Sequence, residues 1–494
     1  MIEGQVGDCF CRDSLVAHLD SCQGKTLGEL DVADVFQKAV KKPKITGIAG
    51  DVIEQSVLGL EQNSRQAPDI KVDGIKYEVK TTGIRKSKDG KGFEAKEPMT
   101  ITAVSPHKIT EEDYFDSNFW HKVEHMLLFY YHYNSPAKVT ALEYSNFPLE
   151  SYQFHEYADF SEDERELLEG DWQRVRDFIR YLKKHYEDKC QDEYPRISYE
   201  LRERLMLLDT APKWPNPPRF RFKRSFVTSI IRKHFSSKKL EQLKTRIGNY
   251  RDLDDKYIEI EKTYKGKTVG ELCDIFGIKD ANGWKSITEP IIIKMFGGTS
   301  KKMHDVDFFS KAGYYGKSFV VTKKGGRTED AKFFTIDFDE FFDDDITFED
   351  SQFCEFFSSA KVLVALFEEP STESPLKDNK FLGFRTVVFK DDFIYGDVKK
   401  VWSRVRNLIR NNELRDVPSL DKSGRQITNK NGEKRSAPNF PKASEGPVFV
   451  RGTGADSKDK RESVNGIRMY YQQVWVKGDY FAKLLAEDFR GAIE

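Results

Sequence analysis

No stretch of this 494-residue sequence stays apolar for long enough to cross a bilayer, so no membrane partner is expected. The N-terminus has no basic segment followed by an apolar one, so no secretory signal peptide is expected. Six cysteines are too few for a disulfide framework in a chain of this length, and a reducing cytoplasm is the expected location. The length exceeds one ordinary hydrophobic core and predicts two or more domains.

The sequence also lacks an excess of either charge. Its 80 Lys and Arg residues stand against 81 Asp and Glu, which gives a net charge of −1. The overall charge therefore indicates no class of partner, and only local clusters of charge are informative. With 38% hydrophobic and 33% charged residues, the composition is that of a soluble globular protein.

Two short patterns near the N-terminus are incomplete versions of known motifs. A group of potential zinc ligands has a C-x-C spacing that common zinc modules do not use, and free thiols are the favoured interpretation; its members are Cys9, Cys11, His18 and Cys22. Residues 24–30 resemble the end of a phosphate-binding loop, but Leu19 stands where that loop needs glycine. We predict instead a helix start, with Thr26 as N-cap and Glu29 completing a capping box.

The stretch with the clearest chemistry is an expected hairpin. Apolar and charged residues alternate over 75–80, which predicts a strand, and Asp-Gly at 73–74 predicts a turn from a shorter strand before it. Glu78 and Lys80 then share one face of the strand, and Asp69 lies across from Glu78. Converging carboxylates are ligands for Mg²⁺, and a neighbouring lysine can hold an attacking water or offset the charge of a phosphate.

This Asp…Glu-x-Lys pattern also arises by chance in charged proteins, where it marks only a solvated edge strand. Its surroundings favour a catalytic site. An expected helix at 50–59 carries Glu54 beside an apolar stripe, and Lys122 precedes an expected buried strand. Residues 160–186 have the pattern of a helix capped by Ser161.

A local basic region spans residues 213–251, where Glu241 is the one acidic residue before Arg251. Phenylalanines alternate with the cations around Phe222, as on a strand. The alternatives are a solvated charged face and a surface that contacts phosphates, and the interleaved aromatics favour nucleic acid. Lys223 and Arg224 are expected to contribute phosphate contacts there.

The second half of the sequence repeats landmarks of the first. Residues 266–272 repeat residues 24–30 with one change, which suggests two copies of one domain. In the same register Asp307 corresponds to Asp69, but no acidic residue lies between 308 and 327. The second copy is therefore expected to lack the catalytic set.

The C-terminal region has its own cations. Residues 411–446 are polar and are predicted to form a long loop. A basic segment follows, and residues 475–485 share the order of strand, basic turn and apolar helix with residues 222–231. The candidate DNA contacts of this region are Arg451, Lys458, Lys460 and Arg461.

Taken together, these motifs resemble the MutH family of DNA endonucleases, and in particular its two-domain restriction enzymes that cut at GATC. The resemblance covers most of the chain. It rests on the order and spacing of residues 24–30, the helix bearing Glu54, the Asp69…Glu78-Val79-Lys80 motif, His121-Lys122-Val123, Gly170-Asp171-Trp172 and residues 222–229.

The resemblance implies a restriction-endonuclease-like α/β core of the PD-(D/E)xK type, with a mixed sheet, present in two MutH-like copies. It implies a catalytic domain at 1–251 and an inactive domain at 252–494 that binds a second DNA site as an effector. Mg²⁺ is the implied cofactor. The implied roles are metal binding for Asp69, Glu78 and Glu54, placement of the attacking water for Lys80, and contact near the scissile phosphate for Lys122.

The implied partner is double-stranded DNA, bound at two sites by a protein that is monomeric in solution and dimerises on DNA, with a companion DNA methyltransferase. The expected DNA contacts of the first copy are Arg202, Arg204, Arg221, Lys223, Arg224, Ser225 and Thr228. The family's base-reading segment differs here over 194–218, which leaves the target sequence and cut position open. A mismatch-repair nickase and a non-catalytic DNA-binding protein remain as alternatives, although a nickase needs only one copy of the domain.

Overall fold

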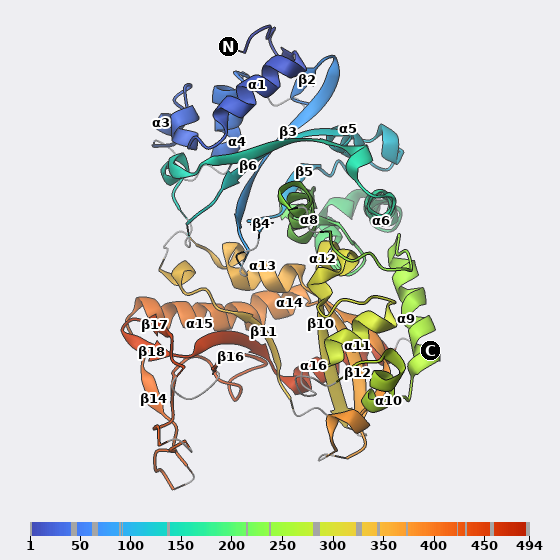
Figure 1. The fold of residues 1–494 in the computed structure, drawn as a ribbon, viewed down its shortest axis with the longest axis vertical. Helices are drawn as coiled ribbons and strands as arrows, with labels where there is room; N and C mark the ends of the chain where they lie inside the picture. The colour runs from blue at the N-terminus through green and yellow to red at the C-terminus, as the bar shows by residue number, and fades with distance from the viewer. Residues whose placement is uncertain are drawn as a thin grey trace. The chain divides into compact units, whose positions relative to one another are not determined.

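The chain forms two compact units (Figure 1). Unit 1 comprises Met1–Ser135, Val139–Lys256 and Phe296–Tyr314, and unit 2 is built mainly from Tyr257–Met295 and Tyr315–Glu494. The computed structural model describes residues 2–490 except 41–46, 62–67, 88–89, 91, 136–138, 214–215, 237–238, 280–286, 323–328, 343–345, 372–373, 422, 430–431 and 455–458. The division of function between 1–251 and 252–494 stays a prediction.

Unit 1 is built on a mixed sheet with the strand order β1-β2-β3-β6-β7, and β4 pairs with β3. Strand β3 is antiparallel to β2 but parallel to β6, and β7 is antiparallel to β6. The strands are β1 (Cys9–Phe10), β2 (Ile70–Val72), β3 (Ile75–Lys86), β4 (Phe93–Ala95), β6 (His125–His132) and β7 (Leu149–Glu156). This mixed α/β arrangement agrees with the predicted fold class.

The predicted hairpin is present as β2 and β3. Asp73 and Gly74 both have positive φ, 49° and 85°, as a tight two-residue turn between antiparallel strands requires. Ile70 pairs with Tyr77, and this register continues to place Asp69 opposite Glu78. The predictions from Asp-Gly for the turn and from the alternation for the facing of the side chains therefore both agree with the structure.

The two faces of this sheet differ in what covers them. Apolar side chains of β3 and β6, including Tyr77, Val79 and Leu127, pack in one core with the N-terminal helices. Figure 1 shows these helices on one side of β3 and β6. These helices are α1 (Arg12–Cys22), α2 (Leu27–Leu30), α3 (Val35–Val40) and α4 (Ile48–Val52). Glu78 and Lys80 alternate with that apolar set and point to the opposite face.

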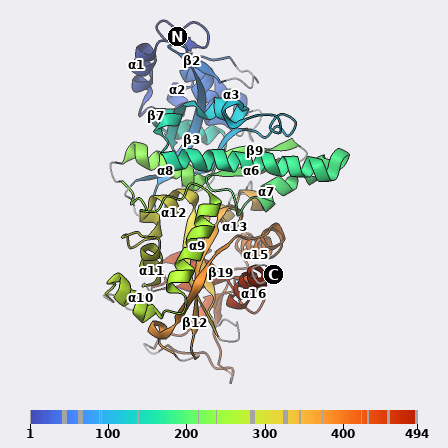
Figure 2. The same ribbon diagram turned by 90° about the vertical axis from the view of Figure 1, so that its right-hand side faces the viewer.

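A second, antiparallel sheet of unit 1 has the order β5-β9-β8. Asp171 is buried on the long helix α6 (Figure 2) and accepts hydrogen bonds from the amides of residues 206–208, so it fixes the approach to β8. The elements of this part are β5 (Met99–Ala103), α5 (Asn118–Val123), α6 (Glu162–Tyr186), α7 (Pro195–Glu200), β8 (Leu208–Lys213), β9 (Asn216–Phe222) and α8 (Arg224–Phe235). Ser161 caps α6 as predicted.

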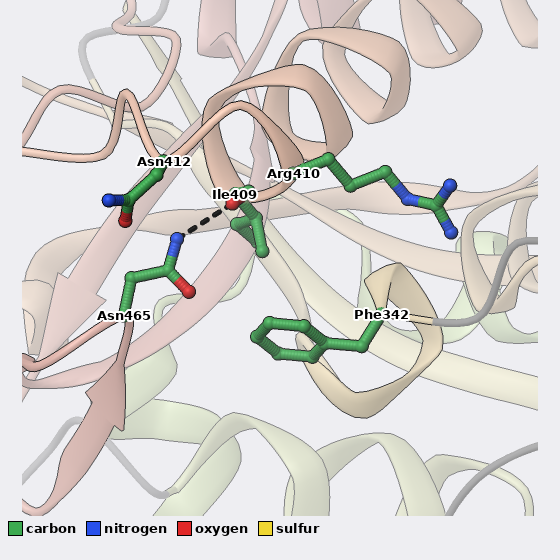
Figure 3. Close-up of a pocket in the computed structure, with 5 residues that line it drawn as sticks. All are labelled: Phe342, Ile409, Arg410, Asn412 and Asn465. Atoms are coloured by element: carbon green, nitrogen blue, oxygen red, sulfur yellow. Dashed lines mark hydrogen bonds between the residues drawn. The ribbon is translucent and has the colours of Figure 1, made fainter.

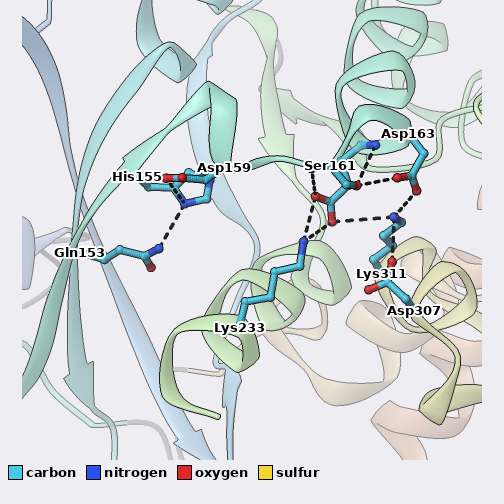
Figure 4. Close-up of polar contacts among 9 residues, drawn as sticks. Gln153, His155, Asp159, Ser161, Asp163, Lys233, Asp307 and Lys311 are labelled. Carbon is cyan, nitrogen blue, oxygen red and sulfur yellow. Dashed lines mark hydrogen bonds and ion pairs between the residues drawn. The ribbon is translucent and has the colours of Figure 1, made fainter. Parts of the chain in front are cut away.

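The segment Phe296–Tyr314 belongs to unit 1, and an ion cluster joins it to the rest of that unit (Figure 4). Lys311, on α12 (Asp307–Ala312), has no exposed side-chain surface. Its Nζ lies 2.5 Å from Asp163 Oδ2, 2.9 Å from Asp307 Oδ2 and 3.8 Å from Glu164 Oε1. The predicted correspondence of Asp307 with Asp69 is therefore wrong, because Asp307 begins a helix and pairs with a lysine instead of preceding a strand.

Unit 2 contains two three-stranded sheets, β10-β12-β13 and β11-β19-β16. Their strands are β10 (Tyr314–Thr322), β11 (Ala331–Thr335), β12 (Lys361–Glu369), β13 (Lys380–Val387), β16 (Val448–Thr453) and β19 (Tyr471–Val476). The helices are α10 (Val269–Phe276), α11 (Thr288–Met295), α13 (Gln352–Ser359), α14 (Asp391–Phe393), α15 (Lys399–Arg410) and α16 (Gly478–Arg490), and α9 (Tyr250–Tyr264) connects the units.

The region predicted as a loop at 411–446 contains paired strands instead. β14 (Asp416–Pro418) and β15 (Ser436–Pro438) are antiparallel, and further backbone bonds join residues 419–429 to 425–435. Figure 1 shows this arm projecting from the body of unit 2. The prediction was wrong because a polar, turn-rich composition is the same in a loop and in an arm of paired strands. In this arm the strands form their backbone hydrogen bonds mainly with each other. Strands β17 (Glu462–Val464) and β18 (Ile467–Met469) form another short hairpin.

The repeated sequence at 24–30 and 266–272 forms the same local structure in each unit. Thr26 with Glu29, and Thr268 with Glu271, make complete capping boxes. In unit 1 the turn exchanges backbone bonds with the start of β7, where Gly24 N–H donates to Leu149 O and Leu149 N–H to Lys25 O. The turn of unit 2 makes the equivalent pair of bonds with Phe381 of β13.

Further contacts repeat between the units. The Oγ of Ser117 and that of Ser351 each cap the next helix and donate to a carbonyl three residues earlier, both at 2.6 Å. Those helices precede β6 and β12, which are buried through most of their lengths. Lys223 and Lys477 each follow a central strand and donate a backbone bond to the residue before the neighbouring strand. The strand order β10-β12-β13 thus parallels β3-β6-β7.

One pocket of unit 2 lies at the C-terminal end of α15. The pocket in Figure 3 has a volume of about 480 Å³, and within it Asn465 Nδ2 donates to Ile409 O at 2.7 Å, which satisfies a carbonyl at the end of α15.

No helix in the described ranges has the length and apolar character needed to cross a membrane.

Candidate active site

The predicted carboxylates come together at the β2–β3 hairpin. Asp69 stands one position before β2 and opposite Glu78 in the extended register. The amide of Val79 donates to Asp69 Oδ2 at 2.9 Å, which fixes the Asp69 side chain toward β3. The hairpin therefore supplies both acidic side chains from adjacent strands.

Glu78 is held between two lysines. Its side chain is only 2% exposed. Lys80 Nζ donates to Oε1 at 2.5 Å and Lys122 Nζ donates to Oε2 at 2.6 Å, so each carboxylate oxygen has a cationic partner. Lys122 comes from α5 and follows Glu78 by 44 positions in the chain. The Ser117 cap sets where α5 begins. The structure thus brings Asp69, Glu78, Lys80 and Lys122 into one site.

Glu54 approaches this group from a different element. It lies on the π-helix η1 (Ile53–Val57), which continues α4. Burial, reinforced by the negative charge of Asp69, raises the pKa of Glu54 to about 7, while Lys80 opposes the rise. Burial and the charge of Glu78 also raise the pKa of Asp69, against the amide of Val79 and the two lysines. Burial and mutual repulsion thus both disfavour the ionised forms of Glu54 and Asp69.

A divalent cation would relieve that repulsion, and the donor chemistry of Asp69, Glu78 and Glu54 suits one. Carboxylate oxygens are the donors Mg²⁺ prefers, and Mg²⁺ characteristically uses one or two protein carboxylates with waters and substrate phosphates. Across the described ranges, no three His, Cys, Asp or Glu side chains come close enough together to hold a metal ion. This agrees with the lysine contacts of Glu78, which occupy the oxygens that a cation would take.

The predicted DNA contacts around β9 and α8 have several partners inside unit 1. Lys223 is 7% exposed, and its ammonium donates to Leu205 O at 2.5 Å. Arg224 donates to Ala95 O and Glu94, and Thr228 accepts from the Ala95 amide. A phosphate contact by Lys223 would require the Leu205 bond to break.

Of the other predicted DNA contacts in unit 1, two have polar partners within the unit and two lie in turns. Arg221 forms a two-pronged pair with Asp209, at 2.7 and 3.1 Å. Ser225 Oγ donates to Lys311 O at 2.9 Å. Arg202 is half-buried and Arg204 is exposed in the turns before β8. Arg219, another cation of the basic region at 213–251, is exposed two residues before Arg221 and shares its face of β9. The basic alternation of the sequence already contained this signal.

Unit 2 contains a basic groove with a volume of about 1070 Å³, which we call the unit 2 groove. It includes Arg451 and Lys460 of the predicted set, whereas the exposed Arg461 pairs with Asp459 beside it and Lys458 lies outside the described residues. Among the described lining residues, Glu433 is the one acid. The basic residues that line the groove are Lys434, Arg435, Lys442, Arg451, Lys460 and Arg468. Arg451 and Lys460 are among the predicted contacts and the other four are not; three of those, Lys434, Arg435 and Lys442, lie in the region predicted to be a loop.

The cysteine group near the N-terminus shows no sign of a metal centre. His18 Nε2 lies 2.9 Å from Val57 O, and Cys9, Cys11 and Cys22 are free thiols. The remaining cysteines, Cys190, Cys273 and Cys354, are also free. These contacts favour the interpretation of structural and surface thiols.

A known protein family matches the part of unit 1 that contains the carboxylates and lysines of the candidate site. The family described as DNA mismatch repair enzyme MutH matches residues 58–168, a range that contains Asp69, Glu78, Lys80 and Lys122. The chain is also 23% identical over 500 residues to the Type II restriction enzyme Sau3AI of Staphylococcus aureus, a comparison that covers 93% of this chain and 95% of that protein. Residues 58–168 thus match the MutH family, and the predicted resemblance to the MutH-type endonucleases is confirmed.

Proposed function

We propose that the protein is a type II restriction endonuclease that hydrolyses double-stranded DNA with Mg²⁺ at a short specific site. The observation that carries the proposal is the placement of Glu78 opposite Asp69 and between Lys80 and Lys122. A structural ion pair would need one lysine. Two lysines with two further carboxylates suit a site that handles both a cation and a phosphate.

In this proposal Asp69 and Glu78 hold the metal, and Glu54 completes the site or orients a bound water. The bound metal would offset charge on the phosphate and lower the pKa of its water. Lys80 places the attacking water, and Lys122 contacts the scissile phosphate. The water oxygen bonds to phosphorus in line while the bond to the 3′ oxygen breaks, which leaves a 3′-hydroxyl and a 5′-phosphate.

We propose further that the two units are copies of one fold and that unit 2 binds a second DNA site as an effector. The paired capping turns, serine caps and strand orders support the duplication. The basic lining of the unit 2 groove supports contact with a phosphate backbone. The target is GATC, cut on its 5′ side, with dimerisation on DNA and a companion methyltransferase. These finer assignments follow from the resemblance to two-domain enzymes of that specificity.

Incubation of the intact protein with plasmid and Mg²⁺ tests the reaction. We expect discrete linear fragments, and sequencing of their ends will give the target and cut position. Accumulated nicks would support a repair-type nickase. A mobility shift without cleavage would support a DNA-binding protein whose metal site is vestigial.

The effector role predicts a difference between substrates with one and two target sites. A DNA that binds unit 2 and favours the active state of unit 1 should accelerate cleavage by about 5- to 150-fold, the range of ordinary coupling energies. The measurement compares initial rates on matched one-site and two-site plasmids, and a short uncleavable duplex in trans should restore the one-site rate. Equal rates that do not respond to the duplex would leave unit 2 as a scaffold.

The basic face of β9 predicts a change in the salt dependence of DNA binding. Arg219 is exposed, so Arg219→Gln should remove about one phosphate contact and lower the log–log salt slope by about 0.9. Binding is measured by fluorescence anisotropy in Ca²⁺ at several salt concentrations. Lys184→Gln, an exposed change at the far end of α6, is the matched control and should leave the slope unchanged. An unaltered slope in Arg219→Gln would show that this face does not contact DNA.

A further inference from the structure

The arm of unit 2 is a stem that divides into two short hairpins. The stem is the pair β14–β15, and it ends where three backbones meet. There the Ser419 amide donates to Arg435 O at 2.9 Å, the Arg435 amide to Ile427 O at 2.8 Å, and the Ile427 amide to Ser419 O at 2.8 Å. Beyond this junction lie the first finger (420–426) and the second finger (428–434), each closed by an antiparallel bridge between its end residues.

The two fingers turn in the same way. The amide of residue 421 donates to the carbonyl of residue 425 at 2.8 Å, and residues 429 and 433 are joined by the same bond at the same distance. Gly424 and Gly432 stand at equivalent places, with positive φ values of 81° and 86°. No described residue between 415 and 439 is buried. The backbone therefore holds the arm in shape, and its side chains are left for solvent or for a partner.

The charged groups that the fingers leave open are cations. Arg425 in the first finger, Lys434 in the second and Arg435 at the junction are exposed, and within the described residues their side chains make no hydrogen bond or ion pair. Asp421 is different, because its carboxylate accepts from the amides of Ser423 and Arg425 in its own turn, at 2.8 and 3.0 Å. The arm thus offers free positive charge to an anionic partner.

The unit 2 groove takes in the second finger but not the first. Asn429, Glu433 and Lys434 line the groove, whereas none of the described residues of the first finger does. The stem is fixed beside the groove, where Lys460 Nζ donates to Ser436 Oγ at 3.1 Å. A phosphate backbone in the unit 2 groove would therefore lie against the second finger, with the first finger beyond it.

We propose that the first finger enters the major groove of the DNA bound by unit 2 and that Arg425 reads guanine there. The major groove, about 12 Å wide, admits a two-stranded β-ribbon, and the minor groove is only about 6 Å wide. Arginine donates to guanine O6 and N7, and the side chain of Leu420, which is 57% exposed, suits the thymine methyl group of the same groove. This inference rests on the proposed effector role and names the element that makes the effector site sequence-specific.

The test adds short uncleavable duplexes in trans to the full-length protein and measures the concentration that half-maximally stimulates cleavage of a one-site plasmid. Three duplexes differ only at the guanines of the target. One has guanine, one has 7-deazaguanine, which lacks the N7 acceptor, and one has hypoxanthine, which lacks only the amino group of the minor groove. With wild type, 7-deazaguanine should raise the half-maximal concentration by about 5-fold or more, and hypoxanthine should change it by less than about 2-fold.

Two variants separate base reading from backbone contact. Arg425→Gln should raise the half-maximal concentration of the guanine duplex by about 5- to 150-fold, and 7-deazaguanine should then cause no further rise, because the contact is already lost. Lys434→Gln should weaken all three duplexes equally and lower the log–log salt slope of that concentration by about 0.9. Lys377→Gln, an exposed change between β12 and β13, is the control and should behave as wild type.

The outcomes distinguish this proposal from the effector role. A 7-deazaguanine effect that persists in Arg425→Gln would assign guanine to another residue and overturn the proposal. Equal stimulation of wild type by guanine and 7-deazaguanine duplexes, or a loss with hypoxanthine alone, would also overturn it while the effector role stands. No stimulation by any duplex would reject the effector role, and the role of the first finger with it.

Discussion

Glu78→Gln should lower the rate of DNA cleavage by about 10³-fold or more while leaving duplex binding in Ca²⁺ largely intact. The change keeps the shape of the side chain but removes the charge that faces Lys80 and Lys122. Asp69→Asn should have an effect of similar size, because both side chains are proposed metal ligands and neither is proposed to read bases. Single-turnover cleavage and anisotropy titrations measure the two properties separately.

The matched control for these variants is Glu111→Gln, an exposed carboxylate of unit 1 outside the hairpin, which should cleave at the wild-type rate. Cleavage by Glu78→Gln or Asp69→Asn within tenfold of wild type would sink the assignment of the metal ligands. A parallel loss of binding would point to a folding defect, because Glu78 is buried between two cations. Thermal unfolding of each variant separates these cases.

The active-site hairpin was predictable because its information is local. Alternation over residues 75–80 fixed the strand, and Asp73-Gly74 fixed the turn and with it the register that places Asp69 opposite Glu78. The lysine pair of Glu78 is different. Lys80 follows from the strand period, whereas Lys122 reaches Glu78 only through the parallel pairing of β3 and β6. The resemblance to a family supplied that long-range contact.

Predictions from the sequence were wrong where the local pattern of residues does not reflect the contacts made in the folded chain. Lys223 looked like a phosphate contact because it stands in a basic run, but its ammonium is used to bind a buried carbonyl. Asp307 matched Asp69 in spacing, but it begins helix α12, which belongs to unit 1. The contribution of the arm's cations to the unit 2 groove could not be predicted, because paired polar strands and a loop have the same composition.

The buried cluster around Lys311 predicts a large loss of stability in Lys311→Met. The methionine fits the space but leaves Asp163, Glu164 and Asp307 without their shared cation. Removing one member of a buried ion pair costs about 3–5 kcal/mol. Because Phe296–Tyr314 reaches unit 1 partly through this lysine, amides of α12 should exchange faster with deuterium, and unit 1 should unfold at lower urea concentration. Lys239→Met, at an exposed lysine of unit 1, is the control and should change stability by less than about 0.5 kcal/mol.

The same cluster fixes the sign of the pH dependence. Burial alone would raise the pKa of Asp163 and of Glu164, but the charge of Lys311 outweighs it, with Lys233 also acting on Glu164, so both pKa values lie below their ordinary 3.8 and 4.5. A depressed carboxyl pKa stabilises the fold above the unfolded value and loses that contribution as the pH falls through the folded value. Wild type should therefore lose stability below about pH 4, through protonation of these carboxylates, more steeply than Lys311→Met, which has already lost the interaction. Parallel stability curves for the two proteins between pH 5 and pH 3 would show that Lys311 does not hold these carboxylates ionised. In that case the attachment of α12 to unit 1 would rest on its apolar packing.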